Sequence, residues 1–123
     1  MYTLDTNAII YSLNEDPDVV QVLDPLFEQD RAIFVSAITE LELLSHPGMT
    51  DEEIAEIDQL LTSVVIFPLE SRLAHLAGYL RRQYRIKTPD SVIAATALLT
   101  RTTLVTRNIQ DFEHIDNLVL LAI

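Results

Sequence analysis

The chain has 123 residues, of which 49% are apolar, and this is typical of a single domain (1–123) with one hydrophobic core. The absence of cysteine excludes disulfides and thiolate metal sites, and with no secretory signal and no long apolar run we expect a cytoplasmic protein without a membrane span. The net charge of −11 argues against a general nucleic-acid binder but not against an enzyme that gathers carboxylates around a cation.

Short apolar strands alternate with helices along the first half of the chain. We expect a strand at 1–4, a helix at 7–13 and a helix at 19–29 that Pro25 kinks or breaks. A second strand at 32–35 leads through Ser36, a predicted N-cap, into a helix at 37–45. The turn His46-Pro47-Gly48 ends that helix, and Thr50 with Glu53 forms a capping box for a helix through residue 61.

The second half repeats the alternation. A strand at 64–67 precedes an amphipathic helix at 70–84, and Thr88 and Pro89 are predicted as the N-cap and first residue of an almost wholly apolar helix that runs to about residue 100. A strand at 103–106, a short helical turn and a last strand at 118–121 complete the chain. This pattern predicts a three-layer α/β/α fold around a mostly parallel four- to five-stranded sheet.

Acidic residues recur where predicted strands end and helices begin. In such a fold the site gathers at the carboxyl edge of the sheet, which is where these junctions meet. The residues are Asp5 after the first strand, Glu40 and Glu42 after the second, Asp90 in the first turn of the apolar helix, and Asp111 after the fourth strand, with Asn108 just before it. Singly, Asp90 is explained by the helix dipole, and Asn108 and Asp111 by an N-cap and its partner.

Together these acids predict a metal site. Asp5 lies between an apolar strand and an apolar helix, so we expect it to be buried and to need a partner. Few basic residues lie near the junctions, and Arg107 alone is adjacent to one. Two carboxylates about 5 Å apart repel by roughly 3 kcal/mol at an effective dielectric near 20, so we expect a hard ion, Mg²⁺ or Mn²⁺, and metal-assisted phosphodiester hydrolysis. Helix geometry leaves the choice between Glu40 and Glu42 open.

Four segments of the chain, at 2–8, 35–44, 89–98 and 104–112, make it resemble the PIN domain superfamily and, within it, the VapC-type toxin ribonucleases. The resemblance implies a PIN-like fold and an Mg²⁺- or Mn²⁺-dependent endoribonuclease. It also implies the residues that act as catalytic and metal-binding acids, namely Asp5, Glu42, Asp90 and Asp111, and the polar residues that support them, namely Thr6, Asn7, Thr106 and Asn108. The chain departs from many relatives after the second acid, where His46-Pro47-Gly48 displaces a glycine.

The resemblance also implies partners. These are an RNA substrate, a small antitoxin that pushes a basic segment into the acidic pocket, and a second copy of the chain in a homodimer. The alternative is a PIN-like module that binds RNA or protein without cutting. Nucleotide binding through a glycine-rich loop is excluded because the chain has two glycines, and we interpret His46, His75 and His114 as surface or structural residues.

Overall fold

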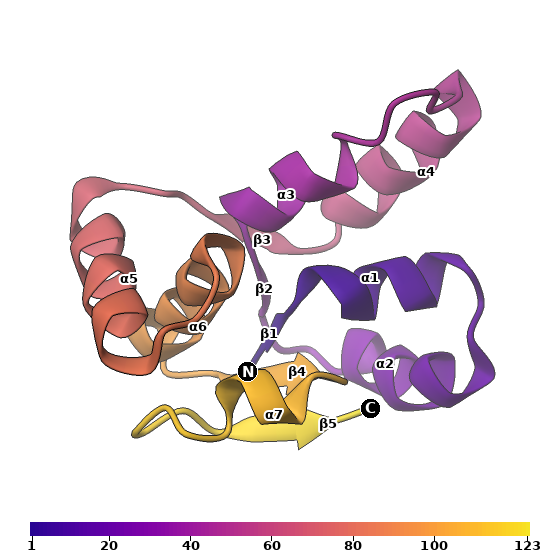
Figure 1. Cartoon of the computed structure of the whole chain (residues 1–123). Coiled ribbons are helices and arrows are strands. Elements are labelled where there is room, and N and C mark those ends of the chain that lie inside the picture. Colours follow the sequence, from indigo (N-terminus) through magenta and orange to yellow (C-terminus); the bar gives the residue numbers. More distant parts are fainter.

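Five short strands form one parallel sheet in the order β3-β2-β1-β4-β5 (Figure 1). The computed structural model describes all residues from Met1 to Ile123. The strands are β1 (Tyr2–Leu4), β2 (Ile33–Ser36), β3 (Val65–Phe67), β4 (Thr103–Thr106) and β5 (Leu120–Ala122). In the centre of the sheet, Leu4 of β1 lies opposite Val35 of β2 on one side and Val105 of β4 on the other. The predicted parallel sheet is confirmed, with five strands.

Seven helices surround the sheet. They are α1 (Thr6–Leu13), α2 (Pro17–Glu28), α3 (Ala37–Leu43), α4 (Asp51–Leu61), α5 (Ser71–Tyr84), α6 (Thr88–Thr100) and α7 (Ile109–Phe112). Figure 1 shows α5 and α6 on one side of the strands and α1 and α2 on the other. None of the helices combines the length and the apolar character that a membrane span requires.

The hydrophobic core is divided by the sheet into two clusters. In β4, Leu104 packs with residues of α5 and α6, whereas its neighbour Val105 packs with residues of α1 and α2. Successive side chains of a strand point to opposite faces, so both faces of the sheet are covered. Residues 91–97 of α6 are all buried, as the apolar run predicted. The three-layer α/β/α architecture is confirmed.

The chain changes direction between β1 and β4, and this positions the site. From β1 it proceeds outward to β2 and β3, and it then returns to the other side of β1 to form β4 and β5. In open parallel sheets, such a switch point leaves a crevice outside the carboxyl ends of the two central strands. Asp5 directly follows β1 and Thr106 ends β4, so both lie at this crevice.

Several predicted helix boundaries are corrected by the capping geometry. Helix α1 begins at Thr6 because the Asp5 side chain caps it, and α2 begins at Pro17 because Asp16 accepts from two backbone N–H groups. Lys87, not Thr88, is the N-cap of α6, so Pro89 is its second residue. Helix α2 continues through Pro25, which was expected to kink or break it, while its apolar face remains buried. The Ser36 cap and the Thr50–Glu53 capping box are confirmed.

Smaller differences concern the ends of other elements. Helix α3 ends at Leu43 and is capped by Leu44, and β5 spans Leu120–Ala122 instead of 118–121. Short strands at a sheet edge carry few residues, so the hydrophobic pattern alone does not define where pairing starts.

Candidate active site

Asp5 is a buried carboxylate at the switch point of the sheet, with 4% of its surface exposed. Its Oδ1 accepts a hydrogen bond of 2.7 Å from the backbone N–H of Ala8, and its Oδ2 accepts one of 2.5 Å from the hydroxyl of Thr106. The predicted burial is confirmed. The sequence offered Asp5 few basic partners: no cationic side chain pairs with it, and two neutral donors fix both of its oxygens.

The Thr106 hydroxyl joins Asp5 to the segment that follows β4. It donates to Asp5 and accepts a hydrogen bond of 2.9 Å from the backbone N–H of Asn108. Thr106 is completely buried, so its side chain has one arrangement that satisfies both partners. Thr106 therefore holds the first carboxylate and the loop that carries Asn108 in a fixed relation.

Glu42 is the glutamate that reaches the same crevice. The Thr6 hydroxyl donates a hydrogen bond of 2.7 Å to Oε1 of Glu42 and lies 3.0 Å from the hydroxyl of Thr39. Glu40 makes no side-chain hydrogen bond and lies outside the cavity that Glu42 lines. The packing of α3 against α1 thus separates the two glutamates that helix geometry left equivalent.

A cavity of about 210 Å³ connects these residues, and we call it the acidic pocket. It is lined by Asp5, Thr6, Asn7, Ile10, Glu42, Asp90, Ile93 and Asn108. The structure therefore brings together three of the four predicted acids and three of the four predicted supporting residues, with Thr106 directly behind Asp5. Asp111 lines a neighbouring cavity, which shares Asp90 with the acidic pocket.

Burial and neighbouring carboxylates raise the pKa of two acids of this region, Asp5 and Asp90. Burial raises the pKa of Asp5, the charge of Glu42 raises it further, and the hydrogen bonds from Thr106 and Ala8 oppose the shift. Burial also raises the pKa of Asp90, and the charges of Asp111, Asp5 and Glu42 add to that increase, whereas Lys87 opposes it. The four predicted acids therefore share one electrostatic field, although Asp111 lies outside the acidic pocket.

The cations near the site are not where the sequence placed them. Arg107, the one basic residue expected to adjoin a junction, lies over the ring of Tyr11 at 4.3 Å, pairs with Asp16 at 3.5 Å and donates to the carbonyl of Ile123. Its charge is directed away from Asp5. Lys87 is the nearby cation instead, because it is the N-cap residue of α6 and Asp90 lies in the first turn of that helix.

The donor set of the acidic pocket fits a hard divalent cation in its chemistry. The donors are carboxylate, hydroxyl and amide oxygens, and no cationic side chain lines the pocket. No three His, Asp or Glu side chains have the spacing of direct ligands of one ion. The volume of about 210 Å³ leaves room for several water molecules at roughly 30 Å³ each, and Mg²⁺ retains water when proteins bind it.

Two sets of residues were missed by sequence reasoning. Thr39 is completely buried against Thr6, and Ile93 forms the apolar wall of the acidic pocket; only tertiary packing reveals either contact. The helix-capping role of Asp5 was missed too, although an Asp before a helical run is a known N-cap signal. His114, interpreted as a surface residue, is exposed but lines the neighbouring cavity.

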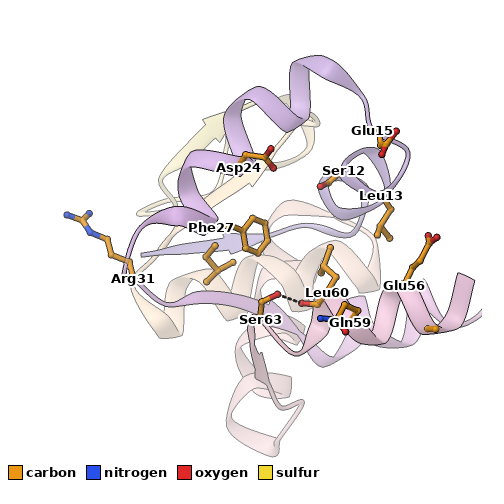
Figure 2. A pocket seen from close by; sticks show the side chains of 12 residues that line it. Ser12, Leu13, Glu15, Asp24, Phe27, Arg31, Glu56, Gln59, Leu60 and Ser63 are labelled. Atoms are coloured by element: carbon orange, nitrogen blue, oxygen red, sulfur yellow. Dashed lines mark hydrogen bonds between the residues drawn. The ribbon is translucent and has the colours of Figure 1, made fainter. Parts of the chain in front are cut away.

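The largest cavity is a separate groove of about 840 Å³ between α2 and α4. Figure 2 shows Phe27 and Leu60 directed into it, with Asp24, Glu15 and Glu56 around its rim. Arg31 points away from the centre of this groove in the same view. None of the predicted site residues lines it. The largest cavity of this protein is therefore not its candidate active site.

The comparisons with known proteins agree with this geometry. The pattern of the PIN domain family matches residues 2–118. Ribonuclease VapC2 of Rickettsia felis is 30% identical over 128 aligned positions, which cover 98% of this chain and 96% of that protein. Ribonuclease VapC1 of Haemophilus influenzae is 32% identical over 127 positions, covering 96% of this chain and 94% of that protein.

Solved structures give the same result. The crystal structure of VapBC2 from Rickettsia felis, bound to a DNA fragment from its promoter, matches with a TM-score of 0.85 and 29% identity over 99% of this chain and 98% of that chain. A toxin–antitoxin complex from Klebsiella pneumoniae matches with a TM-score of 0.84 and 27% identity over all of both chains. The resemblance to VapC-type ribonucleases is thus confirmed, and the chain belongs to the PIN domain family.

Proposed function

We propose that this protein is a metal-dependent endoribonuclease and the toxin of a VapBC-type toxin–antitoxin pair. The observation that carries the proposal is Asp5, a buried carboxylate fixed by Thr106 at the switch point, with Glu42 and Asp90 lining the same pocket. Its relatives named VapC are ribonucleases, and this supports the activity predicted from the sequence.

The cation is proposed to be Mg²⁺ or Mn²⁺. Asp5, Glu42, Asp90 and Asp111 would hold it, directly or through water. When bound, it would polarise the phosphate, make water a stronger nucleophile and stabilise the leaving oxygen. The raised pKa values of Asp5 and Asp90 support this assignment, because a cation compensates repulsion between carboxylates that no cationic side chain in the acidic pocket neutralises.

The chain's own residues supply orientation and proton transfer. Thr106 and the Ala8 N–H hold Asp5 in one rotamer, and Thr6 holds Glu42. An acid of the cluster that is free of the cation would orient the attacking water and accept its proton. Asn7 and Asn108 lie at the exposed side of the pocket, where their amides would contact the substrate.

An antitoxin partner is proposed on the basis of structural neighbours that are toxin–antitoxin complexes. A basic segment of that partner would suit the acidic pocket because opposite charges attract strongly where water is displaced. The homodimer remains a proposal as well; exposed apolar side chains such as Val65 and Leu69, at 47% and 49%, offer a surface for it. We propose the cytoplasm as its location, since the RNA substrates are there.

The activity is tested by incubating the purified protein with mixed structured RNAs in Mg²⁺, Mn²⁺ or EDTA. We expect cleavage with either metal, none in EDTA, and a loss of at least about 10³-fold for Asp5→Asn. Asp24→Asn is the matched control, because Asp24 is an exposed acid of the α2–α4 groove (Figure 2) and its replacement makes the same change of charge.

Two outcomes would contradict the proposal. Cleavage that persists in EDTA or in the Asp5→Asn protein would mean that the acidic pocket is not the catalytic centre. Absence of cleavage with every metal and RNA tested would favour the alternative, a PIN-like module that binds RNA or protein without cutting.

A further inference from the structure

A second cavity, of about 250 Å³, adjoins the acidic pocket and differs from it in charge. Asp90 lines both cavities. The second one is lined by Arg85, Lys87 and His114 together with Asp90 and Asp111. We call it the mixed-charge pocket. A ligand that spans both pockets would meet carboxylates in one and cationic or donor groups in the other.

Basic residues are concentrated in the segment of the chain that borders the mixed-charge pocket. Four of the eight basic residues fall within residues 81–87, in a protein of net charge −11. Arg81 and Arg82 occupy the last turn of α5, where the helix dipole favours cations. Arg85 and Lys87 follow the helix and line the pocket instead. The α5 dipole therefore explains Arg81, Arg82 and the C-cap residue Arg85, but not Lys87, which lies at the positive end of α6.

Arg85 and Lys87 are also free of ion pairs. The two ion pairs of the chain join Arg107 to Asp16 and His114 to Glu113. The only lysine and one arginine thus line a pocket beside the proposed catalytic acids without being held in an ion pair, although the charge of Lys87 acts on Asp90. An unpaired guanidinium with five fixed donors is well suited to phosphate.

The start of α6 adds to this positive potential. Lys87 is its N-cap residue, and no side chain accepts from the N–H groups of its first turn. A helix N-terminus carries a partial positive charge and binds anions. Two exposed cations and the N-terminus of the 13-residue helix α6 therefore border the same pocket, beside Asp90 in the first turn of that helix.

We propose that Arg85 and Lys87 form a phosphate-binding subsite that holds the RNA backbone on the α5–α6 side of the acidic pocket. This rests on the proposed ribonuclease function and specifies how a strongly acidic protein retains a polyanionic substrate. The phosphate bound there is a neighbour of the one that is cut, since the cut phosphate must lie among the carboxylates. Single-stranded RNA is the expected substrate form, because its backbone can bend between two adjacent small pockets.

The backbone conformation of Arg85 permits a substitution that removes its charge and is compatible with the fold. Arg85 caps α5 in the left-handed conformation, with φ of 56° and ψ of 38°. Arg101 caps α6 in the same conformation, with φ of 54° and ψ of 45°, and it lies at the opposite end of that helix. Glycine is the preferred residue at such positions, so either Arg→Gly change is compatible with the fold. Both remove one exposed charge.

The experiment measures binding in an uncut complex. Fluorescence anisotropy of a labelled single-stranded RNA is recorded with the Asp5→Asn protein and with its Arg85→Gly and Arg101→Gly derivatives, in Mg²⁺ at several salt concentrations. We expect Arg85→Gly to raise the Kd by about three- to tenfold and to reduce the salt slope by about 0.7, the loss of one phosphate contact. Arg101→Gly should remain within about twofold, and Lys87→Ala should follow Arg85→Gly.

A second readout separates this proposal from the ribonuclease function. In the protein that retains Asp5, Arg85→Gly should raise KM and leave kcat within about twofold. The reason is that the Arg85 guanidinium binds the substrate equally before cleavage and in the transition state. Equal Kd and KM values for the Arg85→Gly and Arg101→Gly proteins, with normal cleavage by the unmodified protein, would overturn the subsite and leave the function intact. Weaker binding by Arg85→Gly without any cleavage would support the subsite and contradict the function.

Discussion

The α2–α4 groove and the acidic pocket differ in size and in chemistry, and the smaller one contains the candidate site. The groove measures about 840 Å³ and the acidic pocket about 210 Å³. Acids of the groove such as Asp24 and Glu56 are exposed to solvent, whereas Asp5 is buried and both of its oxygens are bonded. In a parallel sheet, the position of the switch point between strand ends therefore locates the candidate site better than the volume of a cavity does.

The groove offers surface, while the acidic pocket offers fixed functional groups. Acids around the groove, such as Asp24 and Glu56, are exposed and make no side-chain hydrogen bond. Two carboxylates of the acidic pocket have a defined side-chain donor, Thr106 for Asp5 and Thr6 for Glu42. Such preorganised groups can stabilise a transition state without rearrangement. Substitutions in the two regions should accordingly differ in their effect on activity.

After Asp5→Asn, the largest expected loss of cleavage is that of Glu42→Gln. It is tested by comparing the two glutamates of α3, Glu42 and Glu40. Glu42→Gln should reduce cleavage by about 10²-fold, because it removes a carboxylate from the acidic pocket. Glu40→Gln makes the same chemical change outside the pocket and should remain within about twofold. Initial rates on one labelled RNA decide the matter, and a larger loss for Glu40→Gln than for Glu42→Gln would refute this assignment.

A smaller effect is expected from the threonine that orients Asp5. Thr106→Val preserves the shape but removes a hydroxyl that donates to Asp5 and accepts from the Asn108 N–H, so cleavage should fall about 10- to 100-fold. Thr3→Val is the matched control, since Thr3 is a buried strand residue whose hydroxyl bonds Thr102 away from the pocket. Each variant should lose about 1–3 kcal/mol of unfolding free energy.

The two threonine variants distinguish positioning from stability. If both lose stability to a similar degree but only Thr106→Val loses activity, Thr106 positions the first carboxylate. Parallel losses of activity would mean that Thr106 acts through the fold alone. Thermal unfolding and cleavage rates are measured on the same preparations.

The fold could be predicted from the sequence because its signals are local. Apolar strands, the capping box at Thr50 and Glu53, and the apolar run of α6 each depend on neighbouring residues, and the structure confirms them. The alternation of strands and helices then restricts the sheet to parallel connections. Errors occurred where two residues compete for one role, as Lys87 and Thr88 do for the N-cap of α6.

The site was less predictable because its arrangement is tertiary. Acids at strand ends and helix starts identified Asp5 and Asp90, but the side of α3 that reaches the pocket depends on packing against α1 through Thr6. Arg107 is adjacent to the junction in sequence, but tertiary contacts with Tyr11 and Asp16 hold it outward, and these were not predictable. Lys87 is close to Asp90 already in sequence, because it is the N-cap residue of the helix whose first turn contains Asp90.

The raised pKa of Asp90 predicts how stability depends on pH without metal. The folded state binds the Asp90 proton more tightly than the unfolded state, mainly because burial and the charge of Asp111 disfavour the carboxylate. Between the ordinary pKa of an Asp and the raised value, the unfolding free energy should therefore fall as pH rises. Above the raised value the stabilising contribution of the protonated form is lost, and the repulsion remains at neutral pH.

Thermal unfolding of the protein and of Asp90→Asn, at neutral pH with and without Mn²⁺, tests most directly whether the acidic pocket is a cation site. Without metal, Asp90→Asn should melt slightly higher, by about 2 °C, because one like-charge repulsion of about 0.5 kcal/mol is removed. Saturating Mn²⁺ should stabilise the unmodified protein by about 2–3 kcal/mol and reverse the order. An unchanged Tm in Mn²⁺, or an equal rise in both proteins, would contradict the account.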